Sequence, residues 1–218
     1  MVERYSRKQM KEKWTLKAKY DAWLRVEKSA VKAWNKLGLI SDEDCEKIVK
    51  NAAFDIDRIE EIERETKHDV IAFLTSVSES LGDESRFVHY GMTSSDCIDT
   101  AVALQIKDSL ELIIEDVNIL LNALKKRADE HKYTLMVGRS HGIHGEPITF
   151  GLVLAIWYDE IKRSLENLMS VKKIVSVGKI SGAMGNFAHS PVELEEMVCE
   201  DLGLSPAPAS NQIIQRDR

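Results

Sequence analysis

The sequence predicts an all-α protein, in which an N-terminal helical domain precedes the first long helices of an elongated helical bundle. Only 4 prolines and 11 glycines occur in 218 residues, and the first proline is Pro147. These are the two residues that helices tolerate least. Apolar residues also recur at helical spacing along most of the chain. We therefore expect the helical domain over residues 1–92 and the first part of the bundle over residues 93–218.

Amphipathic helices are expected throughout the N-terminal domain. Ser6 and Gln9 have the spacing of a capping box, which would open the first helix. An apolar stripe follows over residues 16–37, and Gly38 would end that helix in the left-handed conformation. A loop is expected over residues 86–96, which carry no such stripe. The other helices of this domain are expected over residues 41–53, 57–64 and 70–81.

Two long helices are expected in the rest of the chain. The first would cover residues 98–130 and extend about 50 Å. Its apolar residues follow each other at steps of four and three, as in a helix packed lengthwise against others; they are Ile106, Leu110, Ile113, Val117, Leu120 and Leu124. A second stripe covers residues 150–168, and Pro147 suits the first position of that helix. The polar stretch of residues 136–146 would join the two helices as antiparallel neighbours.

The C-terminal part combines glycines with one short helix. Three glycines interrupt the helical pattern over residues 178–185, and Ser190 would cap a helix that reaches Leu202. Residues 215–218 resemble the start of another helix, and two long helices alone would not cover their own apolar stripes. We therefore expect the chain to be the N-terminal part of a longer protein, with a flexible natural tail as the alternative.

Charge and cysteine content exclude several classes of protein. The chain has 30 basic and 36 acidic residues, a net charge of −6, which does not favour a nucleic acid or a membrane surface as partner. Its three cysteines are odd in number and far apart, which argues against a disulfide scaffold and favours a cytoplasmic location. No apolar run approaches the roughly 20 residues of a membrane span.

Two histidines stand out in a glycine-rich stretch between the long helices. His141 and His144 are three residues apart, which is not the spacing of a zinc-binding HExxH helix. No nearby cysteine or aspartate completes a set of metal ligands, so we expect no metal. General acid–base work suits an imidazole, whose ordinary pKa is about 6.5. Metal binding and a purely structural role are the alternatives.

Two further polar segments precede helices. Thr93, Ser94 and Asp96 stand before the first long helix, where they would cap its free backbone amides. The same amides and hydroxyls could bind a carboxylate or a phosphate, because a helix N-terminus is electropositive. The Lys67–Asp69 segment, taken alone, is typical of a charged helix entry.

Together these segments carry a family resemblance. They are Arg4–Ser6 (RYS), Lys67–Val70 (KHDV), Val88–Asp96 (VHYGMTSSD), Gly138–Gly151 (GRSHGIHGEPITFG), Gly178–Gly185 (GKISGAMG) and Gln215–Arg218 (QRDR). In this order, and over essentially the whole chain, they resemble the adenylosuccinate lyases of the bacterial type, a family of the fumarase/aspartase superfamily. Its sibling families usually carry a glutamine-containing motif in place of His141–His144.

The resemblance implies a β-elimination. Fumarate would leave adenylosuccinate, giving AMP, and would leave SAICAR, giving AICAR. A base removes the proton next to a carboxylate, and an acid protonates the departing nitrogen. The resemblance implies no metal or organic cofactor, and it implies a homotetramer whose active sites are built from three subunits. Negative charge develops on the substrate carboxylate, so fixed donors around it would lower the barrier.

The resemblance also implies roles for individual residues. His141 would be the general acid, and His68 would assist it. Thr93 and Ser94 would hold the succinyl carboxylate. The other substrate-binding residues would be Arg4, Tyr5, Lys67, Asp69, His89 and Gln212. Lys67 stands where arginine is common in the family, and a lysine makes a different contact from an arginine fork.

One family motif is absent from the sequence, namely the mobile glycine–serine loop that supplies the serine assigned as the catalytic base. We therefore expect negligible lyase activity from these 218 residues alone. Two other hypotheses remain open. One is a sibling lyase that acts on another succinyl-type substrate. The other is a non-catalytic helical interaction module, which would not explain the histidines and hydroxyls between the helices.

Overall fold

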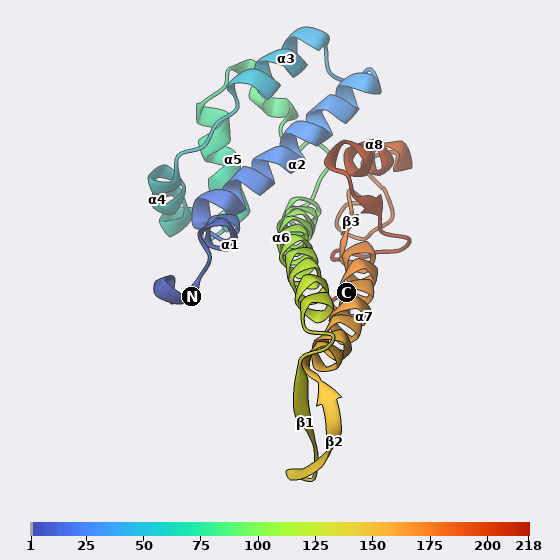
Figure 1. The fold of residues 1–218 in the computed structure, drawn as a ribbon. Coiled ribbons are helices and arrows are strands. Elements are labelled where there is room, and N and C mark those ends of the chain that lie inside the picture. Colours follow the sequence, from blue (N-terminus) through green and yellow to red (C-terminus); the bar gives the residue numbers. More distant parts are fainter. Residues whose placement is uncertain (1) are drawn as a thin grey trace. The chain divides into compact units, whose positions relative to one another are not determined.

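The computed structural model describes residues 2–218 and is mostly helical (Figure 1). It forms two compact units: unit 1 comprises the residues up to Asp108 together with Ile174–Arg218, and unit 2 comprises Ser109–Lys173. The all-α prediction is confirmed, with two short sheets added within residues 2–218. The domain boundary after residue 92 stays a prediction.

The helices and strands follow one another in this order along the chain: η1 (Glu3–Tyr5), α1 (Lys8–Lys13), α2 (Leu16–Lys36), α3 (Asp42–Asn51), α4 (Ile56–Thr66), α5 (Asp69–Glu79), η2 (Asp83–Phe87), α6 (Ser94–Glu130), β1 (Leu135–Ser140), β2 (Ile143–Thr149), α7 (Phe150–Val175), β3 (Val177–Gly178), α8 (Val192–Leu202) and β4 (Ser205–Pro206).

Unit 1 is built around α2, against which α3 and α8 pack. Trp23 of α2 and Phe73 of α5 are fully buried and meet edge to face, with ring centroids 5.3 Å apart. Tyr20 contacts both rings, at 5.3 Å from Trp23 and 5.6 Å from Phe73. Such aromatic contacts stabilise by about 0.5–1.5 kcal/mol each beyond the burial of their surface. The aromatic stripe of α2 therefore forms the centre of this core.

The prediction of one helix that opens at Ser6 and ends at Gly38 is correct at its end and wrong at its start. Gly38 follows the helix with a positive φ of 80°, as predicted. Ser6, however, caps no helix: its hydroxyl donates to the carbonyl of Val2 at 3.1 Å, and α1 begins at Lys8. The N-cap of α2 is Thr15, whose side chain accepts the N–H of Ala18. A local hydroxyl-to-carbonyl bond thus replaces the expected capping box.

The long helix α6 begins at Ser94 and covers 37 residues, or about 55 Å. In unit 2, its C-terminal part pairs with α7. The Lys172 ammonium lies 2.8 Å from the Glu111 carboxylate, and at the other end the N–H of Gly151 donates to the carbonyl of His131 at 3.0 Å. Residues near the start of one helix thus meet residues near the end of the other, so the predicted antiparallel pair is confirmed.

A β-hairpin, rather than the expected polar loop, joins α6 to α7 (Figure 1). β1 and β2 are antiparallel, and Ser140 pairs with Ile143 across the turn. The two residues between them, His141 and Gly142, have φ angles of 54° and 74°. Two positive φ values are what a type I′ turn requires, and this turn matches the twist of a hairpin. His141 therefore lies at the tip of a two-stranded arm.

The prediction that Pro147 starts the second long helix is wrong. Pro147 lies in β2 opposite Val137, and α7 begins at Phe150. Proline has no N–H to donate, but a ribbon of only two strands leaves half of its backbone groups unpaired, so it tolerates the residue. The local preference of proline for a helix start is overridden here by strand pairing.

The predicted cap of α8 is also wrong in detail. Pro191 is the residue before the helix, and the Ser190 hydroxyl donates to the carbonyl of Ile180 at 3.2 Å instead of capping. Gly203 ends the helix in the left-handed conformation, with a φ of 65°. The end of this helix thus follows local chemistry, whereas its start is determined by the segment packed against it.

We expect Gly142→Ala to loosen the hairpin tip, because a side chain at a φ of 74° is strained by about 1–2 kcal/mol. Amide hydrogen exchange at Ile143 should accelerate by roughly fivefold or more. Gly145→Ala is the matched control, since its added Cβ would meet no atom closer than 3.7 Å. Equal exchange rates in the two variants would contradict the turn assignment.

Candidate active site

The predicted site segment Lys67–Asp69 joins α4 to α5. Lys67 ends α4 in the left-handed conformation, and His68 is the N-cap of α5. The Nδ1 of His68 accepts the N–H of Ile71 at 3.4 Å, so the interpretation as a helix entry is confirmed. Because Nδ1 is the acceptor, a neutral His68 carries its proton on Nε2. That side of a 43% exposed ring is available to donate to a ligand.

Two of the predicted substrate-binding residues, Asp69 and His89, are tied to α2. The ammonium of Lys19 lies 3.8 Å from the Asp69 carboxylate. Further along α2, Glu27 accepts the backbone N–H of His89 at 2.9 Å and contacts its Nδ1 at 2.7 Å. At 1.5 Å per residue, Lys19 and Glu27 are about 12 Å apart along the helix. The spacing between these parts of the candidate site is therefore set by α2.

The Glu27–His89 pair is largely excluded from water, with side chains 1% and 16% exposed. Burial by itself would lower the pKa of His89, but the charge and the hydrogen bond of Glu27, together with the charge of Asp96, outweigh it and raise that pKa. The neighbouring Tyr90 is also held by α2, because Nε1 of Trp34 donates to its carbonyl at 3.0 Å. The loop before α6 is thus fixed to α2 at two points.

The N-terminus of α6 carries the predicted carboxylate-binding hydroxyls. The carboxylate of Asp96 accepts the N–H of Thr93 at 2.8 Å, and the N–H of Asp96 donates to the carbonyl of Thr93 at 2.9 Å. Asp96 thus bonds the residue before the helix, as in a capping box, whereas the predicted capping by the hydroxyls of Thr93 and Ser94 is wrong. Neither hydroxyl, of Thr93 or of Ser94, has a hydrogen-bond partner within the described residues. Both residues are half-buried, so these hydroxyls remain available to a ligand.

Asp96 also organises the glycine segment, because it forms a buried ion pair with Lys179. Both side chains are 0% exposed. The Asp96 carboxylate further accepts the N–H groups of Ser181 and Gly182 at 3.2–3.3 Å, and the Lys179 ammonium donates to the carbonyl of Gly182 at 3.1 Å. Thr100 exchanges two 3.0 Å hydrogen bonds with the backbone of Lys179. The start of α6 and the glycine segment are thus one hydrogen-bonded structure.

Sequence reasoning missed Glu27 and Lys179 as supports of the site. The signal for Glu27 is its place on a stripe: it stands one helical turn after Trp23 and one before Val31, on the buried face of α2. A carboxylate at such a position needs a buried partner. Lys179 stands between Gly178 and Ile180, both buried, and carries a similar signal.

Unit 2 holds His141, the predicted general acid. His141 and His144 are exposed on the hairpin, at its tip and in β2 opposite Arg139. Residues 2–218 contain no cluster of three or more histidine, cysteine or acidic side chains that could hold a metal ion. None of the described helices combines the length and the apolar character that a membrane span requires.

The remaining predicted residues are at the surface of unit 1. Arg4 and Tyr5 belong to η1, where the guanidinium lies 4.9 Å from the centroid of the Tyr5 ring. Gln212 is exposed in the segment that follows β4. No hydrogen bond, ion pair or ring contact joins Arg4, Tyr5 or Gln212 to the Lys67–Asp69 segment within the described part of the chain, so their role in a common site stays a prediction.

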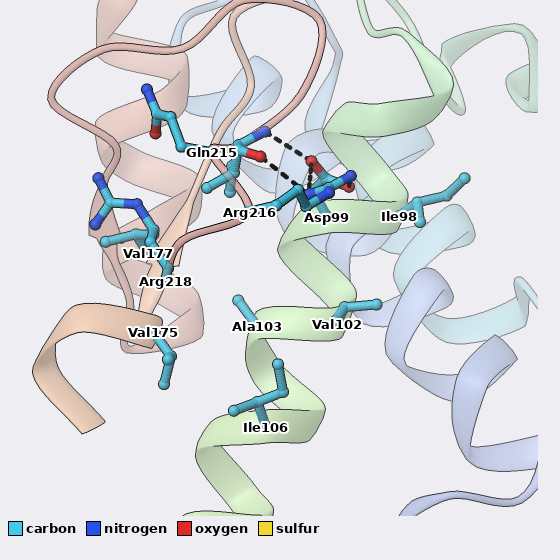
Figure 2. Close-up of a pocket in the computed structure, with 11 residues that line it drawn as sticks. Ile98, Asp99, Val102, Ala103, Ile106, Val175, Val177, Gln215, Arg216 and Arg218 are labelled. Atoms are coloured by element: carbon cyan, nitrogen blue, oxygen red, sulfur yellow. Dashed lines mark hydrogen bonds and ion pairs between the residues drawn. The ribbon is translucent and has the colours of Figure 1, made fainter. Parts of the chain in front are cut away.

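A pocket of about 260 Å³ in unit 1 contains none of the predicted site residues (Figure 2). Asp99 and Arg216 lie at this pocket and form a two-point ion pair with N–O distances of 2.9 and 3.0 Å. Asp99 also accepts the N–H of Ile214 at 2.7 Å. The other lining residues are mostly apolar; they are Ile98, Val102, Ala103, Ile106, Val175, Val177, Ile214, Gln215 and Arg218. Asp99 therefore holds the C-terminal segment against α6, and the mostly apolar pocket offers little polar chemistry.

Comparison with known proteins identifies the family. A protein-family model described as "Lyase" matches residues 3–218. The chain belongs to this lyase family. Its predicted resemblance to adenylosuccinate lyases is confirmed: proteins of that name from Helicobacter pylori (strain ATCC 700392 / 26695) and Bacillus subtilis (strain 168) are 63% and 50% identical to it over all 218 residues.

The family members that match differ from the chain in length. The chain spans about half the length of the curated relatives it matches, at 50% of the Helicobacter pylori protein and 51% of the Bacillus subtilis protein. Among solved structures, a fumarate lyase from Mesorhizobium sp. BNC1 matches 93% of this chain and 49% of its own, with a TM-score of 0.86 and 25% identity. A 3-carboxy-cis,cis-muconate lactonizing enzyme from Pseudomonas putida shares the fold, with a TM-score of 0.84 and 24% identity.

We expect Lys179→Met to destabilise this lyase-family chain by about 3–5 kcal/mol, because it leaves the Asp96 carboxylate buried without its counter-charge. Lys32→Met is the matched control. Its ion pair with Asp201 is exposed, and its loss should cost at most about 1 kcal/mol. Urea unfolding of both variants measures the two costs, and similar values would contradict the role of the buried pair.

Proposed function

We propose that the chain is part of an adenylosuccinate lyase, which eliminates fumarate from adenylosuccinate and from SAICAR to give AMP and AICAR. The observation that carries the proposal is the 50–63% identity to proteins of that name over all 218 residues. The motif segments of the sequence, from Arg4 to the C-terminal QRDR, agree with it. The sibling-lyase and interaction-module hypotheses lack a comparable observation.

In this proposal, His141 is the general acid that protonates the leaving nitrogen, and His68 assists it. An exposed imidazole at the tip of a hairpin can reach a substrate held elsewhere in the assembly. His68 adds an Nε2 donor, because its Nδ1 is occupied by the start of α5. The serine base would come from the part of the protein that the 218 residues do not include.

Thr93 and Ser94 would bind the succinyl carboxylate. Their hydroxyls are unpaired in the described residues and stand at the positive end of a 37-residue helix. Fixed donors at this point would stabilise the charge that forms on the carboxylate during elimination. The nucleotide would be held by the remaining predicted residues; they are Arg4, Tyr5, Lys67, Asp69, His89 and Gln212.

The proposed protein is a cytoplasmic homotetramer, and unit 2 supports assembly because two helices cannot cover each other's apolar surface. Its exposed apolar side chains include Ile119 at 61%, Ile156 at 58% and Trp157 at 50%. Light scattering on the protein extended to the length of its relatives should give the mass of four chains. A stable monomer would contradict the tetramer.

The reaction is tested by fumarate release from adenylosuccinate, with the protein extended to the length of its relatives. We expect turnover from that protein and none from residues 1–218 alone. His141→Ala should lower kcat at least 100-fold, as the loss of a general acid does. His144→Ala is the matched variant on the same hairpin, and its loss should be much smaller.

The outcomes separate the hypotheses. Equal losses in the two histidine variants would point to a shared structural or metal-binding role and contradict the acid assignment. No release from a folded wild-type protein would keep the family and reject this substrate. In that case AMP should not raise the melting temperature of the protein. The products of sibling lyases would then be tested in the same way, and the one that raises the melting temperature would identify the substrate.

A further inference from the structure

We propose that Glu27 is a positioning residue, which orients His89 so that its Nε2–H donates to an anionic group of the bound substrate. The inference rests on the proposed function, which puts His89 in the nucleotide site. Glu27 itself is buried at 1% exposure and does not need to touch the substrate. It acts through two contacts to one residue, the backbone N–H at 2.9 Å and the ring Nδ1 at 2.7 Å.

The two contacts determine which ring nitrogen carries a proton. An ionised carboxylate can only accept hydrogen bonds, so Nδ1 of His89 must be the donor to Glu27. Nε2 is then left for a ligand, and no group of the described residues bonds it. On a neutral ring this nitrogen would be an acceptor and would repel an anion. On an imidazolium it is a charge-assisted donor, which binds phosphate or carboxylate.

The charges around His89 favour the imidazolium. Glu27 faces it from α2, and Asp96 acts on it from α6, although Lys179 balances part of the Asp96 charge. Cys97, also on α6, stays a neutral thiol because burial raises its pKa well above the ordinary value. The nearest negative charge is therefore the Glu27 carboxylate, and its removal should lower the pKa of His89.

The backbone of His89 gives an independent sign of this constraint. Its φ of 65° lies in the left-handed region, which residues other than glycine adopt infrequently. The hydrogen bond from its N–H to Glu27 is one such restraint, and the bond from Trp34 to the carbonyl of Tyr90 is another. This backbone geometry brings the ring and the N–H of His89 to the same carboxylate.

The test is Glu27→Gln in the protein extended to the length of its relatives, with KM for adenylosuccinate measured from pH 5.5 to 8. Glutamine keeps the size and an acceptor oxygen but removes the charge. Without the Glu27 charge the pKa of His89 should fall, because burial disfavours the charged ring, so less of it is an imidazolium at neutral pH. KM should rise about tenfold over wild type at pH 7.5, as expected for the loss of one charge-assisted hydrogen bond, and the ratio should fall toward one as the pH is lowered.

Glu195→Gln is the matched control, since Glu195 is another buried carboxylate that accepts a backbone N–H, from Ile180 at 2.7 Å. It should lower the melting temperature without making KM depend on pH. A rise of KM in Glu27→Gln that is equal at every pH, or a loss confined to kcat, would overturn the proposal.

A second measurement does not depend on turnover. Deuterium exchange at Cε1 of each histidine, read by mass spectrometry over a pH series, gives the pKa of His89 directly. Its midpoint should be higher in wild type than in Glu27→Gln, and equal midpoints would overturn the proposal. If the wild type releases no fumarate, the proposed function fails, while the midpoints still decide whether Glu27 controls the charge of His89.

Discussion

The buried ion pair between Asp96 and Lys179 is the constraint on which most of unit 1 depends. Two opposite charges with no exposure to solvent are tolerable only if both are fully bonded, and here each has further partners. Asp96 caps α6 and accepts hydrogen bonds from backbone amides of the glycine segment. Thr100 bonds the backbone of Lys179. Any shift of α6 along its axis would break this set of bonds together.

A second constraint is the helix α2. The same face of this helix carries the aromatic residues of the core and the charged residues that hold parts of the candidate site. Tyr20 and Trp23 form the aromatic core, and one turn later Glu27 holds His89. Lys19 reaches Asp69 from the start of this stripe. Stability and site geometry are therefore not separable here, because a rotation of α2 that disturbed its aromatic packing would also displace two parts of the candidate site.

Much of this fold could be predicted because it follows local rules. The seam of α6, its antiparallel partner and the glycine ends at Gly38 and Gly203 follow from spacing and from residue type alone. The errors at Pro147 and Ser190 have a common cause. Each residue has a strong local preference that a partner in another segment overrides, the strand β1 in one case and the carbonyl of Ile180 in the other.

The candidate site, too, could be predicted only in part. Its residues could be named from motifs, but their supports could not, since Glu27 lies 62 residues before His89 and Asp96 lies 83 residues before Lys179. No spacing rule relates positions so far apart. A charged residue on an apolar stripe, as Glu27 is, indicates only that some buried partner exists.

The hairpin acts as a lever arm for His141. Strands of this kind rise about 3.3 Å per residue, so six residues carry the imidazole roughly 20 Å from the ends of α6 and α7. A tilt of about 5° at the base would move the tip by about 2 Å, enough to spoil the proton transfer proposed for His141. The base is held by Gly151, where an added Cβ would approach the carbonyl of Ala128 to 2.6 Å, and by the bond from Phe150 to Thr134. The position of His141 is thus determined by contacts at the base of the hairpin, far from His141 itself.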